Sequence, residues 1–162
     1  MPSDTWTTPP DFAALEVPTA AKLNQMRDDL YALWLAITTG SASIAERLSS
    51  GVYTPTLTNT TNIAASTAYE CQWMRIDSVI TVSGKFDVDP TTAGAVCVLG
   101  LSLPVASNIG ADEDVGGVAA QHGLNDQGGI LGDAANNRAT VRFTPSSAAN
   151  QAWSFTYTYQ VI

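Results

Sequence analysis

The chain has 162 residues, of which 45% are apolar and 14% are charged, and its formal net charge is −8 at pH 7. This composition is too apolar for a disordered tail, and no apolar run is long enough to span a bilayer. The negative charge opposes binding to the phosphate backbone of nucleic acid and to an anionic membrane surface. We therefore expect a folded protein whose partners are neither nucleic acid nor membrane.

Residues 1–18 contain four prolines and few periodic apolar positions, which predicts an extended arm. The arm has two large aromatic side chains, Trp6 and Phe12, which need a surface on which to be buried. A partner protein, a neighbouring subunit and the body of the same chain are the candidates. We expect Trp6 and Phe12 to anchor the chain to another protein or subunit, because the arm has no structure of its own.

The next segment predicts a helix over residues 20–38, with Thr19 as its N-cap and Gly40 just beyond its end. Five apolar residues recur in it at spacings of three and four, which is the a/d pattern of a coiled coil. They are Leu23, Met26, Leu30, Leu33 and Ile37. We expect them to form the interface of a homotrimer.

An alternative is that this helix packs on the β-body of its own chain, which Tyr31 and Trp34 favour because they widen its apolar face. Two heptads are marginal by themselves, so a bundle needs contacts elsewhere. A brief helical turn is expected around residues 44–48. The predicted organisation is an anchoring arm over 1–18, a helical trimerisation stem over 19–50 and a β-body over 51–162.

Within the body the apolar residues alternate with polar ones. The alternation is strict over residues 153–161 and clear over 80–88, which predicts strands buried on one side. Weaker strand signals cover about 52–58, 68–76, 95–103, 115–120, 128–132 and 138–144. About eight short strands separated by turns predict a mainly β fold, with an antiparallel β-sandwich of the jelly-roll type.

The sequence contains little that indicates catalysis. His122, in a glycine-rich stretch, could be paired with Asp126 and one of the serines, but no Gly-x-Ser-x-Gly motif is present. We interpret His122 as a loop residue and expect no enzymatic activity. The glycines near it lack the Lys-Ser/Thr of a phosphate-binding loop.

The acidic residues 112–114, together with Asp87 and Asp89, raise the alternative of a calcium site, although the EF-hand spacing is absent. A solvated loop is the interpretation we favour, and we expect no metal and no cofactor. The N-terminus lacks a secretory signal, so folding in a reducing cytoplasm is expected. Cys71 and Cys97 lie in strand-like apolar runs and are predicted to be buried free thiols.

Several short motifs resemble tailed-bacteriophage virion proteins. Trp6-Thr7-Thr8-Pro9 and residues 18–33 are similar to the opening of many such proteins. The body resembles the terminal β-domain of phage fibre, spike and head-decoration proteins in the order of its motifs. These are residues 51–58, 69–75, 79–85, 101–104 and 155–159.

The resemblance implies a trimeric structural protein on the surface of a virion, assembled in the host cytoplasm and attached to capsid or tail subunits by its N-terminal segment. The short distance between arm and body favours a capsid decoration protein or short fibre. The alternative is a receptor-binding tail fibre or spike tip that recognises host-surface carbohydrate. Trp73, Tyr53 and the loops over 104–136 are then the candidate sugar contacts, although Trp73 is also interpreted as a core residue.

Overall fold

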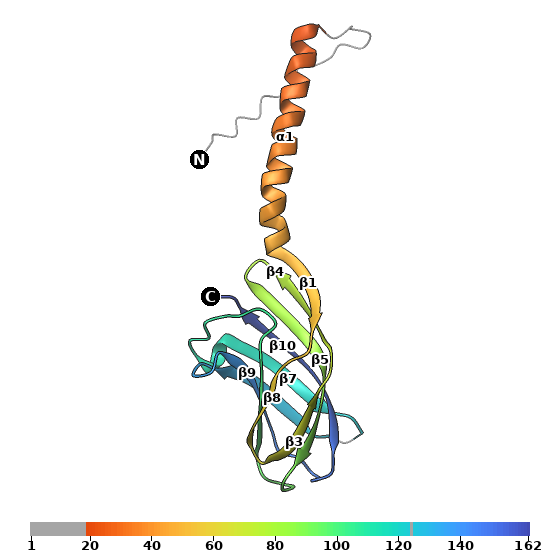
Figure 1. Cartoon of the computed structure of the whole chain (residues 1–162), viewed down its shortest axis with the longest axis vertical. Coiled ribbons are helices and arrows are strands. Elements are labelled where there is room, and N and C mark those ends of the chain that lie inside the picture. The colour runs from red at the N-terminus through yellow and green to blue at the C-terminus, as the bar shows by residue number, and fades with distance from the viewer. Residues whose placement is uncertain (1–18, 124) are drawn as a thin grey trace. The chain divides into compact units, whose positions relative to one another are not determined.

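The computed structural model describes residues 19–123 and 125–162, with the side chains of 35–47 excepted (Figure 1). The chain divides into two compact units, Met1–Ala45 and Glu46–Ile162. The arm predicted over residues 1–18, including Trp6 and Phe12, lies outside the described residues.

The helix α1 spans Ala20–Arg47. Its predicted start is confirmed, because Thr19 Oγ1 accepts a hydrogen bond from Lys22 N at 3.3 Å and the Thr19 carbonyl accepts one from Leu23 N at 3.0 Å. The predicted end is wrong, since α1 continues through Gly40 and includes the turn expected after it. A glycine inside a helix costs only about 1 kcal/mol relative to alanine, and no proline follows until Pro55.

In the described residues after α1 there are ten strands and one short 3-10 helix. They are β1 (Leu48–Tyr53), β2 (Leu57–Thr61), β3 (Ile63–Ala68), β4 (Cys71–Ile76), β5 (Val79–Pro90), β6 (Cys97–Leu101), η1 (Asp112–Asp114), β7 (Val115–Gln121), β8 (Gln127–Asp133), β9 (Arg138–Phe143) and β10 (Gln151–Gln160). All the pairings between these strands are antiparallel, so the predicted mainly β, antiparallel body is confirmed.

The strands form one connected sheet in the order β1-β4-β5-β10-β7-β8-β9-β6-β2, and β3 pairs with β5 (Figure 1). The second half of β5 pairs with β3 and its first half with β4. The two-sheet sandwich or jelly roll that we predicted is not confirmed, because the strands belong to a single curled sheet. Alternation along a strand shows which face is buried but not which strands are neighbours.

The described strands also outnumber the eight predicted, because the strand expected over 52–58 is divided into β1 and β2 and because β3 was not predicted. Pro55 lies between β1 and β2 and has no backbone N–H for a ladder. Asn62, between β2 and β3, has a φ of 54°, a left-handed conformation that asparagine tolerates. Residues 49–51, predicted as the boundary between stem and body, lie in β1.

The core is built on the aromatic row of β10, which lies between β5 and β7. Trp153, Phe155, Tyr157 and Tyr159 are at most 4% exposed. The ring of Trp153 lies 4.4 Å from that of Phe143, centroid to centroid. Burial raises the pKa of Tyr159 to about 12, and its hydroxyl donates to the Val105 carbonyl at 2.7 Å.

Gly117 of β7 is predicted to be irreplaceable at the contact with β10. A Cβ at this position would lie 2.5 Å from Tyr157 Cβ and against the carbonyl of Thr156. Gly117→Ala should therefore destabilise the body by about 1–3 kcal/mol in denaturant unfolding. Gly129→Ala is the control, because a Cβ there meets nothing within 4 Å. Equal unfolding midpoints for the two variants would contradict the packing of β7 on β10.

Candidate self-association surfaces

The apolar residues of α1 are exposed in the single chain. Leu23, Met26, Leu30 and Leu33, which we call the α1 seam, have exposed fractions between 40% and 64%. They occupy successive a and d positions of a helix with 28 residues, about 42 Å long at 1.5 Å per residue. The seam is therefore a continuous apolar stripe on a long helix.

The remaining predicted interface residue, Ile37, lies within α1, but its side chain is not described. Residue 44 comes seven positions after Ile37, which is the spacing of successive a positions. Because α1 extends to Arg47, residue 44 lies within the helix and is its next a position. The sequence holds an isoleucine there. The sequence-based prediction missed it because Gly40 indicated the end of the helix.

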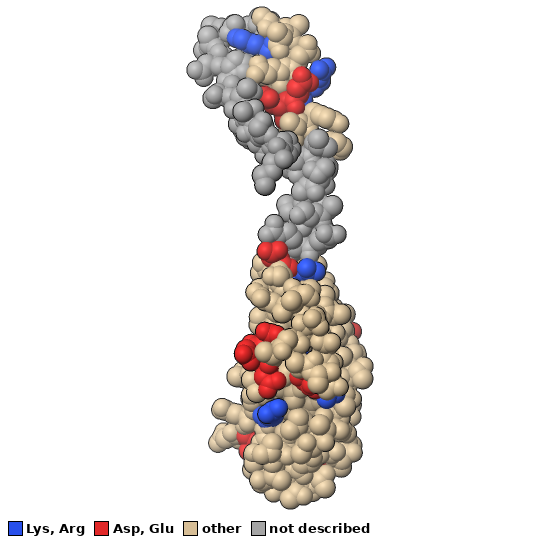
Figure 2. All heavy atoms as spheres, turned by 90° about the vertical axis from the view of Figure 1, so that its left-hand side faces the viewer, with Lys and Arg blue, Asp and Glu red and all other residues tan. Residues whose placement is uncertain are grey.

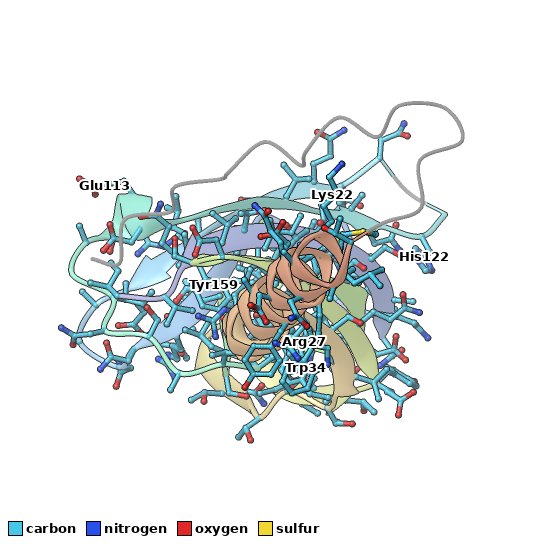
Figure 3. The ribbon with its side chains drawn as sticks, turned by 90° about the horizontal axis from the view of Figure 1, so that it is seen from above. Lys22, Arg27, Trp34, Glu113, His122 and Tyr159 are labelled. Carbon is cyan, nitrogen blue, oxygen red and sulfur yellow. The ribbon has the colours of Figure 1, made fainter. Side chains whose placement is uncertain are left out.

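Two other exposed features of α1 are not part of the seam. The rings of Tyr31 and Trp34 stack on each other, with their centroids 5.8 Å apart. Arg27 and Asp28 form an exposed ion pair at 2.9 Å, which contributes little to stability. Figure 3 shows Arg27 and Trp34 along the helix.

A second exposed apolar surface lies on the side of the sheet opposite the core. We call it the outer face and define it by the outward residues of β1, β4, the first half of β5, β10 and β7. Residues that pair with one another across these strands form three register rows. The first row is Leu48, Ile76, Val79 and Gln160, and the second is Ser50, Met74, Thr81, Thr158 and Gly116. The third row is Val52, Gln72, Ser83, Thr156 and Val118. None of these positions carries a charge, but Glu113 and Asp114 line a hollow together with Val79, Gly116, Thr158 and Gln160 at the β7 end of the face.

Charged residues begin at the next row along β5. Lys85 lies opposite Ser154 of β10, and its Nζ is 3.2 Å from Asp87 Oδ1. Tyr69 donates a hydrogen bond to Asp87 Oδ2 at 2.6 Å, and Lys85 Nζ lies 4.2 Å from the centre of its ring. The bond to Asp87 raises the pKa of both Tyr69 and Lys85. This cluster satisfies its own charges and marks the limit of the outer face.

The two aromatic residues considered as sugar contacts belong to the body's packing. Tyr53 is half-buried, and its hydroxyl lies 2.9 Å from that of Tyr157. Trp73 also packs against the core. A Cβ on Gly51 would lie 3.0 Å from Trp73 Nε1, so the indole covers that glycine. Both residues are partly buried against the core, although Trp73 also lines a hollow beside β1 and β5.

The arrangement around His122 does not reproduce the triad considered from sequence. His122 Nε2 lies 2.6 Å from Ser154 Oγ, and both residues are exposed. The Asp126 carboxylate instead accepts hydrogen bonds from Ser146 N at 2.7 Å and Ser146 Oγ at 2.9 Å. The serine beside His122 therefore comes from β10, a pairing for which the sequence gives no signal.

The acidic residues do not assemble into a metal site. Within 19–123 and 125–162, no group of three histidine, cysteine or acidic side chains is placed to hold a metal ion. Asp114 Oδ2 accepts hydrogen bonds from the backbone of Gly110 and Ala111, at 2.7 and 2.9 Å. Figure 3 shows Glu113 and His122 on opposite sides of the body, and in Figure 2 the acidic residues form small separate groups.

The predicted state of the cysteines is confirmed. Cys71 and Cys97 are free and buried, and burial raises the pKa of both thiols. Low exposure and a low thiolate fraction make them poor nucleophiles.

A hollow of about 560 Å³ lies at the β8 and β9 side of the sheet. The residues that line it include Gln127, Thr144 and Arg142. Arg142 is exposed, and across the described parts of the chain no carboxylate forms an ion pair with it. The hollow therefore presents an unpaired cation and neutral hydrogen-bonding groups.

No helix in the described ranges has the length and apolarity needed to cross a membrane. No protein-family model matches the sequence, and no curated protein matches it.

Two solved structures are similar to the chain, both with a TM-score of 0.46. One is the reovirus attachment protein sigma1, in complex with alpha-2,3-sialyllactose. It is 14% identical, and the match covers 72% of this chain and 68% of sigma1. The other is the receptor binding protein gp15 of Listeria phage PSA, 17% identical, with coverage of 90% and 89%.

Proposed function

We propose that the chain is a structural component of a bacteriophage virion, a homotrimeric surface protein whose copies associate through the α1 seam. The observation that supports this is the exposure of four large apolar residues at heptad spacing. Burying each such side chain is worth about 1.5–3 kcal/mol relative to leaving it in water. Three helices that share their seams remove this unfavourable exposure in every copy.

The residue types of the seam are compatible with a trimer. Leu23 and Leu30 occupy a positions, and Met26 and Leu33 occupy d positions. A two-stranded coiled coil is favoured by β-branched residues at every a position and leucine at d, whereas the a series of α1 mixes Leu23 and Leu30 with isoleucine at 37 and 44. The number three itself comes from the resemblance of the sequence to phage virion proteins.

In this proposal the segment before α1 attaches the trimer to the particle. Trp6 and Phe12 bind capsid or tail subunits, and the β-body faces the surroundings. The protein then acts as a capsid decoration protein or short fibre and catalyses no reaction.

Leu30→Asp is expected to dissociate the trimer, because it places three carboxylates in an apolar seam where they are costly to desolvate. Light scattering should give a mass of three times 17.0 kDa for the unmodified chain and 17.0 kDa for the variant. Ala32→Asp is the matched control, since residue 32 is exposed on α1 at a c position outside the seam. An unchanged trimer mass for Leu30→Asp would show that the seam is not the interface.

An antibody against the body is expected to label intact phage particles. A chain with Trp6→Ala and Phe12→Ala should keep the trimer mass but be missing from purified particles, because its anchor is removed. If the doubly substituted trimer is incorporated normally, the arm is not the anchor. If the antibody labels no particle, the protein is not a virion component.

A second candidate function is recognition of host-surface carbohydrate, and the hollow around Arg142 favours it. A guanidinium pairs with a carboxylate through two parallel hydrogen bonds, and Gln127 and Thr144 can bond with sugar hydroxyls. The suitable ligand is therefore an acidic sugar.

Purified protein is expected to bind acidic glycans on an array, and Arg142→Ala should weaken that binding by about 10-fold or more. Arg27→Ala removes the same charge from exposed α1 and should leave glycan binding unchanged. An equal loss in the two variants would indicate a general charge effect, and no binding to any glycan would remove this candidate function.

A further inference from the structure

We propose that the outer face of the sheet is a second contact between copies of this chain, so that the trimer is held by its β-bodies as well as by α1. This inference rests on the proposed function, because it adds a second interface, on the sheet, to the trimer that the α1 seam forms.

The first observation is the apolar character of the outer face. Six large apolar residues on four of its five strands, β1, β4, β5 and β7, have exposed fractions between 37% and 61%. They are Leu48, Val52, Met74, Ile76, Val79 and Val118. Five strands about 4.8 Å apart place these side chains on one surface roughly 20 Å wide. Five of them lie on the adjoining strands β1, β4 and β5, and β10 separates Val118 from this group. A cluster of exposed apolar residues of this kind is typical of a protein–protein contact.

The second observation, which points to a copy of the same chain, is the charge distribution. The chain has a net charge of −8, so two copies repel each other where their charged surfaces meet. The three register rows of the outer face hold apolar, hydroxyl and amide side chains without any charge. Thr81 Oγ1 and Thr158 Oγ1, in the middle of this surface, lie 3.3 Å apart and can bond with each other. Glu113 and Asp114 line a hollow at the β7 end of this face, so copies can meet without desolvating an ion over β1, β4 and the first half of β5.

The third observation is the connection between α1 and the sheet. β1 begins at Leu48, directly after α1 ends at Arg47. In a trimer with parallel helices, whose axes lie about 10 Å apart, the β1 strands of the three copies start close together. The local concentration of one body near the next is then in the millimolar range. A modest apolar contact is sufficient to form at that concentration.

Cysteine labelling tests this contact. Val52→Cys and Val118→Cys place a thiol on the outer face, and Val96→Cys is the matched control. Val96 lies outside the five strands and is 55% exposed, compared with 57% for Val52 and 61% for Val118. The native thiols are buried, so a maleimide reports on the introduced cysteine. Each variant is kept reduced until labelling, and its mass is measured in parallel.

In samples of trimer mass, we expect Val52→Cys and Val118→Cys to react at least about 10-fold more slowly than Val96→Cys. Adding Leu30→Asp should release the copies and raise the rates of Val52→Cys and Val118→Cys to that of Val96→Cys. Equal rates in a trimeric sample would overturn the contact while leaving the α1 trimer intact. Slow labelling that persists at a mass of 17.0 kDa would also overturn the contact, because the introduced cysteines would then be shielded by residues of their own chain. A monomeric unmodified chain would overturn the proposed function, and this inference with it.

Discussion

The packing of the β10 aromatic row against β5 and β7 is the interaction on which the body depends. Trp153, Phe155, Tyr157 and Tyr159 fill the inner side of the curled sheet, and the hydroxyl groups of the two tyrosines are bonded to Tyr53 and Val105. A ring that is buried with its polar atom satisfied gives apolar burial without a desolvation penalty. The body thus has a complete core of its own.

Because the core is complete, the apolar residues that remain exposed need a different explanation. They fall mainly into two sets, the α1 seam and the outer face, and each set follows the period of its own secondary structure. Scattered exposed leucines are normal on any protein, but residues ordered at heptad or cross-strand spacing form surfaces. In the assembly that we propose, association between copies covers both surfaces, and the strands β1, β4 and the first half of β5 present no charge on the outer face to oppose it in an acidic chain.

The sequence predicted those features that depend on local periodicity. The strict alternation over 153–161 located β10, and Thr19 marked the start of α1. The end of α1 was missed because a single glycine is a weak stop signal, and the division of residues 52–58 into β1 and β2 was missed because Pro55 acts through backbone geometry. β3 was missed because its sequence lacks a strict alternation of apolar and polar residues. Strand order, the outer face and the hollow at Arg142 depend on which strands become neighbours. Local patterns carry no information about that.

The central claim is that the α1 seam binds other copies of the chain, and the mass of the unmodified full-length protein tests it most directly. Sedimentation equilibrium over a wide range of concentrations should give a species of three times 17.0 kDa that dissociates only on strong dilution. A single species of 17.0 kDa at every concentration would contradict the account.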